Sequence, residues 1–478
     1  MTKPNNRPSD LNQKAPKAPR PKAPFERVRE APRESERKLA REPGKGVSPE
    51  GKAAGRDRTR PANPSRSPGA LVNRRAADRL RDGYLWVYAS DIESLEAPDT
   101  GSGYPPTLLP VADSRGLLLG TALYSPSSLI ALRMVSREAI DEADWLELLA
   151  ARLRTSIGRR LPRLNSKESE IDSCRLCFSE ADELPGLIID KYGPLIIVQR
   201  LAKGLQTTGV SQVCVSVLRN LLEPATILER PDSRIRELEG LAAPDPAPLW
   251  AENPVNPLTI TQFRLNGLAF QYDANSGQKT GAFLDQCANY SVTQQYAWLM
   301  TPGGRALDVC TYEGGFALHL ARVCKRVTGI DSSRASLEVA ERNLETNRAQ
   351  LTGEVDWVEG DAFQILRDWS DAGEKFDSIV LDPPAFAKSH RALEGALRGY
   401  KELNLRALKM LRPGGLLLTC SCSHHVGWAE LEGAVASAAV DAGRRVRLLE
   451  RRGAAIDHPV VLNLPETEYL KCLVLMVE

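Results

Sequence analysis

Short apolar runs alternate with helical patterns over the C-terminal part of the chain, from about residue 305. The runs are residues 306–309, 327–330, 355–358, 378–381 and 416–419. Strands that alternate with helices are typical of a parallel sheet covered by helices. Two further predicted strands, residues 445–449 and 470–477, close the sheet as an antiparallel edge pair. The pattern predicts an α/β domain built on seven strands.

The fourth of these runs ends in Asp382-Pro383-Pro384. Open α/β sheets bind ligands at the carboxyl ends of their strands, and two prolines fix the turn there. Asp382 and Phe386 can then face a flat ring. An enzyme that holds a nucleobase beside a methyl donor needs such an arrangement. The alternative is an ordinary strand-to-loop turn, because Asp-Pro is a common turn opener. The order of the surrounding features favours the first interpretation.

The ends of the first three runs carry residues that suit S-adenosylmethionine (SAM). Gly314 and Gly315 allow a ligand close to the backbone at a helix N-terminus, but the loop lacks the G-x-G-x-x-G pattern of dinucleotide sites. Asp331 follows Asp308 by 23 residues, near the spacing at which an acidic strand end binds ribose. Asp361 can accept an adenine amine. The predicted cofactor residues here are Asp308, Tyr312, Gly314, Gly315, Phe316, Asp331, Asp361, Ala362 and Phe363.

Each of these carboxylates, taken alone, could instead be a helix cap. Three of them at successive strand ends, followed by the D-P-P corner, favour cofactor binding. SAM fits better than a dinucleotide because it has a ribose, an adenine and a charged amino-acid tail but no pyrophosphate.

Cys422 lies three residues beyond the end of the fifth run and should lie beside Asp382. Buried cysteines are usually inert, but a thiolate at this edge can attack an electrophilic ring carbon. Methylation of a pyrimidine at carbon 5 needs such an adduct at carbon 6. We therefore predict Cys422 as the nucleophile and Asp382 as the group that helps to carry the ring proton. Cys420, on the same strand, is predicted to be structural.

Other functions also fit these residues. A methyltransferase that acts on an exocyclic amine of adenine or guanine would also suit D-P-P followed by an aromatic residue, and it needs no cysteine. A non-catalytic RNA-binding ribosome-assembly factor with a vestigial methyltransferase fold is a second alternative. A nicotinamide-dependent dehydrogenase is disfavoured because the phosphate-binding glycine pattern is absent.

The N-terminal segment differs from the rest of the chain in composition. Residues 1–70 contain 18 Lys and Arg, 8 Asp and Glu and 12 of the 33 prolines, although the whole chain carries a net charge of only +2. Such a segment cannot bury enough apolar surface to fold, so residues 1–68 are predicted to be a disordered tail. Its charge suits attraction to RNA, although a merely solubilising tail is an equal alternative.

Localisation is predicted from what the sequence lacks. No apolar run reaches the 18 residues of a membrane span, and no secretory signal is evident. The nine cysteines are scattered, which is typical of reduced thiols in the cytoplasm. We expect a cytoplasmic protein with no membrane partner and no metal site.

The middle of the chain reads as two smaller units. Short apolar runs over residues 71–136 predict a β-rich module. A helix over 139–161 follows, then strands near 174–178 and 186–199, a helix near 210–222 and a strand at 226–230. Residues 263–272 predict a hairpin that turns at Asn266-Gly267. The expected domains are 1–68 (tail), 69–138, 139–255 and 256–478.

Several motifs together resemble those of the RlmI-type large-subunit rRNA cytosine-5 methyltransferases, over about residues 71–478. They are R-L-R-D-G-Y-L-W-V-Y, A-D-E-L-P-G-L-I-I-D-K-Y-G, G-Q-K-T-G-A-F-L-D-Q, T-Y-E-G-G-F, L-D-P-P-A-F-A-K-S, S-C-S and H-P-V…P-E-T-E-Y-L-K. The resemblance implies an N-terminal PUA-like RNA-binding domain, a small α/β central domain and a C-terminal Rossmann-like class I SAM-dependent methyltransferase. Cys422 falls on the catalytic cysteine position of that family.

The resemblance also implies partners and leaves some departures. Its substrate is cytosine in 23S rRNA, presented as rRNA or as a large ribosomal subunit precursor, and a homodimer is compatible with it. The tail has no counterpart in the family, His424-His425 follow S-C-S where some members carry glycine, and Ala385 follows D-P-P where two-cysteine enzymes carry a cysteine. The release of product must then be handled differently.

The remaining predicted site residues are more ambiguous. Lys279 lies within the glycine-flanked loop G-Q-K-T-G, and Gln286 follows it. The loop could contact the cofactor, RNA phosphate or neither, and we include both residues with the cofactor residues. The predicted substrate-binding residues are Pro383, Pro384, Phe386 and Lys388.

Overall fold

The computed structural model describes residues 69–97, 107–164, 170–243, 245–275, 281–387 and 389–478, all within one unit of the chain, residues 64–478. The predicted tail, Lys279 and Lys388 lie outside these described residues. None of the described helices has both the length and the apolar character that a membrane crossing requires.

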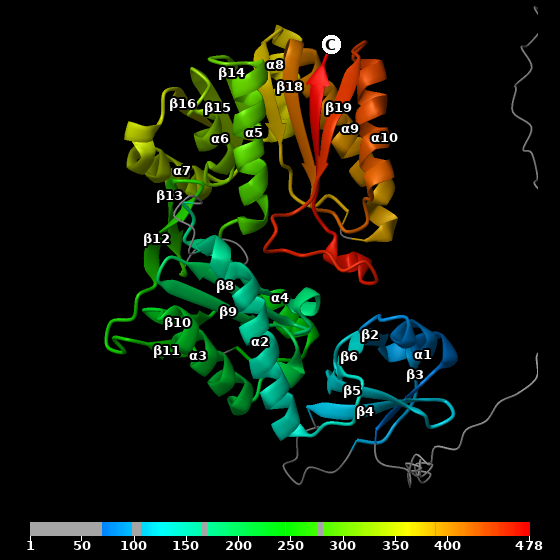
Figure 1. Ribbon diagram of the computed structural model, residues 1–478. Helices are drawn as coiled ribbons and strands as arrows, with labels where there is room; N and C mark the ends of the chain where they lie inside the picture. The colour runs from blue at the N-terminus through cyan, green and yellow to red at the C-terminus, as the bar shows by residue number, and fades with distance from the viewer. Residues whose placement is uncertain (1–68, 98–106, 165–169, 244, 276–280, 388) are drawn as a thin grey trace, which may run out of the picture. The chain divides into compact units, whose positions relative to one another are not determined.

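The N-terminal module is a six-stranded sheet with the order β2-β6-β5-β4-β1-β3 (Figure 1). Its strands are β1 (Ala70–Val72), β2 (Trp86–Tyr88), β3 (Ile92–Leu95), β4 (Leu108–Asp113), β5 (Leu118–Tyr124) and β6 (Ile130–Ser136). Helix α1 (Arg74–Arg81) begins at Asn73, whose side chain accepts a hydrogen bond from the amide of Ala76. The β-rich module predicted from the sequence is confirmed.

The next unit is a five-stranded sheet with the order β11-β10-β9-β8-β7. Its elements are α2 (Glu142–Leu164), β7 (Ser173–Phe178), β8 (Leu187–Tyr192), β9 (Leu195–Arg200), α3 (Thr208–Leu222), β10 (Thr226–Glu229), α4 (Ser233–Leu238) and β11 (Trp250–Ala251). The range predicted as strand, 186–199, contains two strands, because β8 and β9 are antiparallel partners joined by a turn. Gly193, at φ +54°, permits the turn between them.

The predicted hairpin is present as β12 (Ile260–Leu265) and β13 (Leu268–Asp273). Asn266 and Gly267 have φ values of +51° and +82°. Two consecutive positive φ angles are characteristic of the type I′ turn, which matches the twist of antiparallel strands. The prediction of the turn position is therefore confirmed.

The C-terminal sheet has seven strands in the order β16-β15-β14-β17-β18-β20-β19 (Figure 1). They are β14 (Arg305–Val309), β15 (Arg326–Asp331), β16 (Glu354–Glu359), β17 (Phe376–Leu381), β18 (Leu411–Ser421), β19 (Val446–Arg452) and β20 (Lys471–Val477). The first five pair in parallel, whereas β20 is antiparallel to both β18 and β19. This confirms the predicted α/β sheet and its antiparallel edge pair.

Pro413, Gly414 and Gly415, residue types that are typical of a turn, lie inside β18, whose pairing with β17 shifts between Phe376 and Ser378. Gly414, at φ +80°, accommodates the irregularity without ending the strand. Strand β18 therefore starts five residues earlier than its apolar run suggested.

Helices cover both faces of this sheet. One apolar core contains Ala306 and Val380 with residues of α5 (Cys287–Met300), α6 (Gly315–Leu320) and α7 (Arg334–Asn347). The other contains Leu307 and Ile379 with residues of α8 (Ala362–Ala372), α9 (Leu393–Met410) and α10 (Trp428–Asp441). Neighbouring residues of one strand face opposite cores, as the two-residue period of a strand requires.

The strand order reverses at β14, which lies between β15 and β17. Ligands of open α/β sheets bind in the crevice outside the carboxyl ends of the strands at such a reversal. The segments that follow β14, β15, β16, β17 and β18 all lie at this edge because these strands are parallel. The fold therefore brings the predicted site residues to one side of the sheet.

Candidate active site

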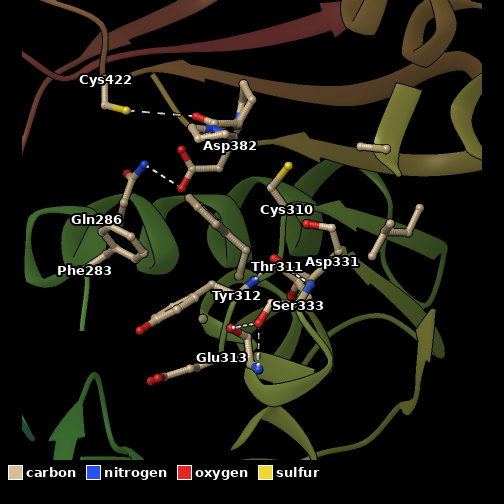
Figure 2. A pocket seen from close by; sticks show the side chains of 18 of the residues that line it. Phe283, Gln286, Cys310, Thr311, Tyr312, Glu313, Asp331, Ser333, Asp382 and Cys422 are labelled. Atoms are coloured by element: carbon tan, nitrogen blue, oxygen red, sulfur yellow. Dashed lines mark hydrogen bonds between the residues drawn. The ribbon is translucent and has the colours of Figure 1, made fainter. Parts of the chain in front are cut away.

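A cavity of about 550 Å³ lies at the carboxyl edge of the C-terminal sheet (Figure 2). Its walls come from the ends of five parallel strands and from the segment that precedes α5. The predicted site residues that line it are Gln286, Tyr312, Gly315, Phe316, Asp331, Asp361, Ala362, Phe363, Asp382, Pro383, Pro384, Phe386 and Cys422.

The loop after β14 is held in an uncommon backbone conformation. Cys310 and Tyr312 have φ values of +63° and +52°, a region that non-glycine residues rarely occupy. The amide of Tyr312 donates to Asp331 at 2.9 Å, and its hydroxyl donates to the carbonyl of Gly281 at 2.8 Å. These bonds hold the ring of Tyr312 against Phe283, with the ring centroids 5.0 Å apart. Backbone strain that the surroundings stabilise in this way is concentrated at functional sites.

Asp331 and Asp361 line the cavity and also organise the backbone beside it. Asp331 accepts one amide hydrogen bond on each carboxylate oxygen, from Tyr312 and from Ser333 (2.9 Å each). Asp361 caps helix α8, because one of its oxygens accepts the amide of Gln364 at 2.9 Å. Asp361 is therefore a helix cap. Because it also lies on the cavity wall, ligand binding by the same carboxylate stays a prediction.

Asp308 and Gly314 lie behind the cavity wall rather than in it. Asp308 is buried, and one of its oxygens accepts hydrogen bonds from the hydroxyl of Thr311 (2.6 Å) and the amide of Ala317 (2.9 Å). Burial raises the pKa of Asp308 to about 7. A Cβ on Gly314 would lie 3.0 Å from the ring of Trp357. Both residues thus stabilise the loop after β14 without lining the cavity.

Asp382 is oriented by a chain of side-chain amides. The amide nitrogen of Gln286 donates to Oδ2 of Asp382 at 3.0 Å (Figure 2). The oxygen of Gln286 accepts from Asn289 at 2.7 Å, and Asn289 accepts in turn from Arg452 at 3.0 Å. Gln286 was predicted beside the cofactor, but its side chain contacts the predicted catalytic carboxylate.

The S-C-S segment presents Cys422 between two buried serines. The hydroxyl of Ser421 donates to the hydroxyl of Tyr400 at 2.9 Å, and the hydroxyl of Ser423 lies 3.1 Å from the same atom. Ser423 also accepts the amide of Ala387 at 3.2 Å, which ties this segment to the one after D-P-P. Cys422 itself is partly exposed, and its sulfur is 4.0 Å from the carbonyl oxygen of Pro383 (Figure 2).

Two other cysteines lie near Cys422 but have different surroundings. Cys310 also lines the cavity, and its burial, followed by the charges of Asp331 and Asp382, raises its thiol pKa. Cys420 is completely buried, which raises its thiol pKa well above the ordinary value. Both therefore stay protonated, and the structural role predicted for Cys420 fits its surroundings.

Several residues of the cavity wall were not selected from the sequence. The hydroxyl of Tyr469 donates to Asp285 at 2.5 Å, although 184 positions separate them. Burial raises the pKa of Glu313 to about 7. The missed lining residues include Phe283, Asp285, Tyr290, Glu313, Ser333 and Tyr469. Asp285 and Tyr469 lie within motifs already singled out, but nothing in the local sequence links them.

Comparison with known proteins gives the family of this chain. A family model described as a PUA-like domain matches residues 71–137, and one described as an S-adenosylmethionine-dependent methyltransferase matches residues 212–461. Ribosomal RNA large subunit methyltransferase I of Erwinia tasmaniensis is 35% identical over 387 residues, which are 81% of this chain and 93% of the relative. The relative of the same name from Pseudoalteromonas translucida is 35% identical over 400 residues, or 83% and 96% of the two chains. The chain belongs to the ribosomal RNA large subunit methyltransferase I family.

Solved structures agree on the fold of this family member. The methyltransferase SMU.776, solved in complex with SAH, superposes with a TM-score of 0.69 at 17% identity over 85% of this chain and 99% of its own. A SAM-dependent methyltransferase from Streptococcus mutans gives the same values. The N-terminal module is thus PUA-like, and the C-terminal sheet is that of a class I SAM-dependent methyltransferase.

SAM is the methyl donor of this family, and the cavity fits it chemically. Two carboxylates, Asp331 and Asp361, lie on the cavity wall at the strand ends. The apolar side chains of Ala362 and Phe363, the next two residues after Asp361, also line the cavity. Carboxylates suit hydroxyl and amine donors, whereas a pyrophosphate would call for backbone amides in a glycine-rich turn.

Proposed function

We propose that this chain transfers a methyl group from SAM to carbon 5 of a cytosine in 23S rRNA, as rRNA or within a large-subunit precursor. One observation carries the proposal: Cys422 and Asp382 follow neighbouring strands and face the cavity that the predicted cofactor residues also line. The names of the relatives, all ribosomal RNA large subunit methyltransferases, support the class of substrate.

We assign the side of the cavity formed by β14, β15 and β16 to SAM. Asp331 would accept the ribose hydroxyls and Asp361 the adenine amine, with Phe363 beside the adenine ring. Tyr312, Gly315 and Phe316 come from the loop and helix start that would face the amino-acid tail. SAM supplies the methyl group when it is bound here.

The opposite side, after β17 and β18, would hold the cytosine. Pro383 and Pro384 fix the backbone that carries Asp382. Phe386 lies between two rings, with centroid distances of 5.8 Å to Phe363 and 4.9 Å to Tyr400, so it can border both ligands. Lys388 belongs to the same segment and stays a predicted substrate residue.

In the proposed reaction the sulfur of Cys422 forms a bond to carbon 6 of the cytosine. The electrons of the carbon 5–carbon 6 double bond move into the ring, and Asp382 hydrogen-bonds the pyrimidine and helps to carry the proton that balances this charge. Carbon 5, now nucleophilic, takes the methyl group as its bond to the donor sulfur breaks, and SAH is left. A base then removes the carbon 5 proton, the double bond forms again, and the bond between sulfur and carbon 6 breaks. A target within structured RNA must first be unstacked.

We also propose a separate role for each domain of the chain. Residues 69–138 would bind RNA, as the PUA-like match over 71–137 suggests. Residues 139–255 would form the central domain and residues 256–478 the catalytic one. Residues 212–461 match the methyltransferase model, so the match also covers part of the proposed central domain.

The test is methyl transfer from labelled SAM to unmodified 23S rRNA by the full chain, with the product nucleoside identified by mass spectrometry. We expect 5-methylcytosine, and we expect Cys422→Ala to lower its formation by roughly 10⁴-fold or more because the nucleophile is lost. Cys310→Ala is the matched control, since Cys310 lines the same cavity, and it should retain most of the activity.

Two outcomes would contradict the proposal. Methylated adenine or guanine as the product would favour the alternative chemistry on an exocyclic amine. Full activity of Cys422→Ala would eliminate the covalent mechanism, although the family and the cofactor would stand.

A further inference from the structure

Lys471 is a buried lysine beside the S-C-S segment. It is the first residue of β20, pairs across the sheet with Ser421 of β18, and is only 3% exposed. Lysines are almost never buried to this degree without partners. Its amine donates to the carbonyl oxygens of Ser423 at 3.3 Å and of Tyr469 at 3.2 Å. The amine is therefore held against the backbone of the residue that follows Cys422.

Two of the three positions around the amine nitrogen are used by these carbonyls. An ammonium has a third N–H, and a neutral amine has a lone pair in the same place. With two of its N–H groups bound to carbonyls, the amine is fixed beside the backbone of the S-C-S segment, from where its charge can act on Cys422.

The charges near this amine include the sulfur of Cys422. Burial lowers the pKa of Lys471, while the carboxylate of Glu468, the sulfur of Cys422 and the carboxylate of Glu430 act in the opposite direction. The amine and the sulfur thus interact electrostatically inside the protein, where such interactions are weakly screened.

We propose that Lys471 is the positioning residue whose positive charge stabilises the thiolate of Cys422. This inference rests on the proposed function, in which Cys422 is the nucleophile. The S–H bond breaks, its proton passes to solvent, and the ammonium ion of Lys471 balances the charge of the resulting thiolate. Because Lys471 acts through Cys422, it touches neither the cytosine nor the methyl donor.

The other groups around Cys422 explain why a cation is needed there. Asp382 faces it from the end of β17 and Tyr400 from α9, and His424 and His425 follow it in the chain. The charges of Cys422 and Asp382 both act on the phenol of Tyr400, after its burial, to raise its pKa. A carboxylate so close disfavours a second negative charge, and Lys471 on β20 supplies the opposite charge.

The same cation accounts for the departure of the cysteine at the end of the reaction. Ala385 follows D-P-P, so the position at which two-cysteine enzymes carry a second thiol has none. The sulfur of Cys422 must then leave without a second thiol to assist the release. A thiol whose thiolate is stabilised leaves faster, so Lys471 would assist both the first and the last step.

The test is the rate at which iodoacetamide alkylates Cys422 in the full chain as pH is varied, with the modified peptide resolved by mass spectrometry. In the wild type we expect the midpoint of this profile at least about one pH unit below the ordinary thiol value of about 8.5. Lys471→Met should move the midpoint up by about one unit or more, and so lower the thiolate fraction at neutral pH by about tenfold. Lys471→Arg should restore the wild-type midpoint because it keeps the positive charge.

Lys401→Met is the matched control. Lys401 follows Tyr400 on α9 but forms its ion pair with Asp441 at 2.6 Å, so its loss should leave the midpoint unchanged. A shift of equal size in this control would show that any lysine near α9 has the same effect, and would overturn the proposal.

A wild-type midpoint at the ordinary thiol value would overturn the proposal without any variant, even if Lys471→Met does not fold. Equal midpoints for the wild type and Lys471→Met would do the same. The proposed function is judged separately by the methylation assay with Cys422→Ala. If that variant is inactive while the midpoints coincide, the nucleophile stands and the role of Lys471 is wrong. If Cys422→Ala is active while the midpoint shifts, Lys471 does stabilise the thiolate and the covalent mechanism is wrong.

Discussion

The two sides of the cavity are held in place by different kinds of contact. On the side of β15 and β16, Asp331 and Asp361 accept backbone amides two and three residues further along the chain. On the side of β17 and β18, Asp382 contacts Gln286, which is 96 positions away, and the backbone at Ser423 contacts Lys471, 48 positions away. The first side thus follows largely from local turn and capping rules, and the second depends on side chains from separate elements.

This difference predicts that substitutions on the two sides will affect different kinetic quantities. Changes at the strand ends of β15 and β16 should weaken SAM binding, whereas changes in the supporting side chains near β17 and β18 should lower turnover. Four variants test this separation, in order of decreasing effect on methyl transfer.

Gln286→Leu should have the largest effect. It removes the hydrogen bond to Asp382 and one of the two acceptors of the buried Asn289 amide, which keeps only the carbonyl of Gly453. A hydrogen bond to a charged group contributes about 1.5–3 kcal/mol, so turnover should fall by roughly 10–100-fold, with SAM affinity nearly unchanged. Turnover at saturating SAM and calorimetric titration with SAM give the two quantities.

The control for this variant is Gln295→Leu, the same change at an exposed position of α5, which should alter neither quantity. A loss of SAM affinity in Gln286→Leu, with normal turnover at saturation, would return Gln286 to the cofactor site where the sequence placed it.

The same contrast decides how much could be predicted from the sequence. Apolar runs located the strands of the C-terminal sheet, and the convergence of parallel strand ends located Asp331, Asp361, Asp382 and Cys422 at one cavity. These predictions need only local patterns and one general rule of α/β sheets. The early start of β18 and the irregularity inside it could not be predicted, because proline and glycine usually mark a turn.

The supporting contacts could not be predicted in this way. Tyr400, Lys471 and the pair Asp285–Tyr469 come from segments that are far apart in the sequence and meet in the folded protein. Nothing in a single sequence fixes which buried hydroxyl or amine will face S-C-S. Asp308 was grouped with Asp331 because both end strands, yet the loop after β14 folds over Asp308 and separates it from the cavity.

Asp331→Asn should have the second largest effect. One of its two backbone amides, from Tyr312 or Ser333, would then face an NH₂ group, and the charge offered to the ribose would be lost. Loss of a charged hydrogen-bond partner predicts SAM affinity lower by about tenfold, with turnover at saturating SAM within a fewfold of the wild type. Titration calorimetry and saturation kinetics measure these effects. Reduced turnover with normal SAM affinity would contradict the assignment of Asp331 to SAM binding.

Asp361→Ser separates capping from ligand binding at a single residue. Serine caps helices as well as aspartate does, so helix α8 should start as before and thermal stability should be preserved. The carboxylate proposed to face the adenine amine is lost, and SAM affinity should fall by up to about fivefold. Asp361→Ala is the matched comparison, since it removes the cap as well. Identical SAM affinity in the wild type and Asp361→Ser would leave Asp361 with the capping role alone.

Asp308→Asn should change stability and leave methyl transfer nearly intact. The pKa of Asp308, about 7 in the folded protein because of burial, lies above its ordinary value of about 4. The folded state therefore binds this proton more tightly, and the contribution is complete below about pH 4 and lost as the pH rises through 7. Asparagine does not titrate, so relative to the wild type the variant should gain on the order of 2–4 kcal/mol between pH 5 and pH 8. Urea unfolding at several pH values measures this gain, and parallel profiles would show that Asp308 ionises normally. A gain with unchanged SAM affinity would separate Asp308 from Asp331 by function, although the sequence presents them as equivalent strand-end carboxylates.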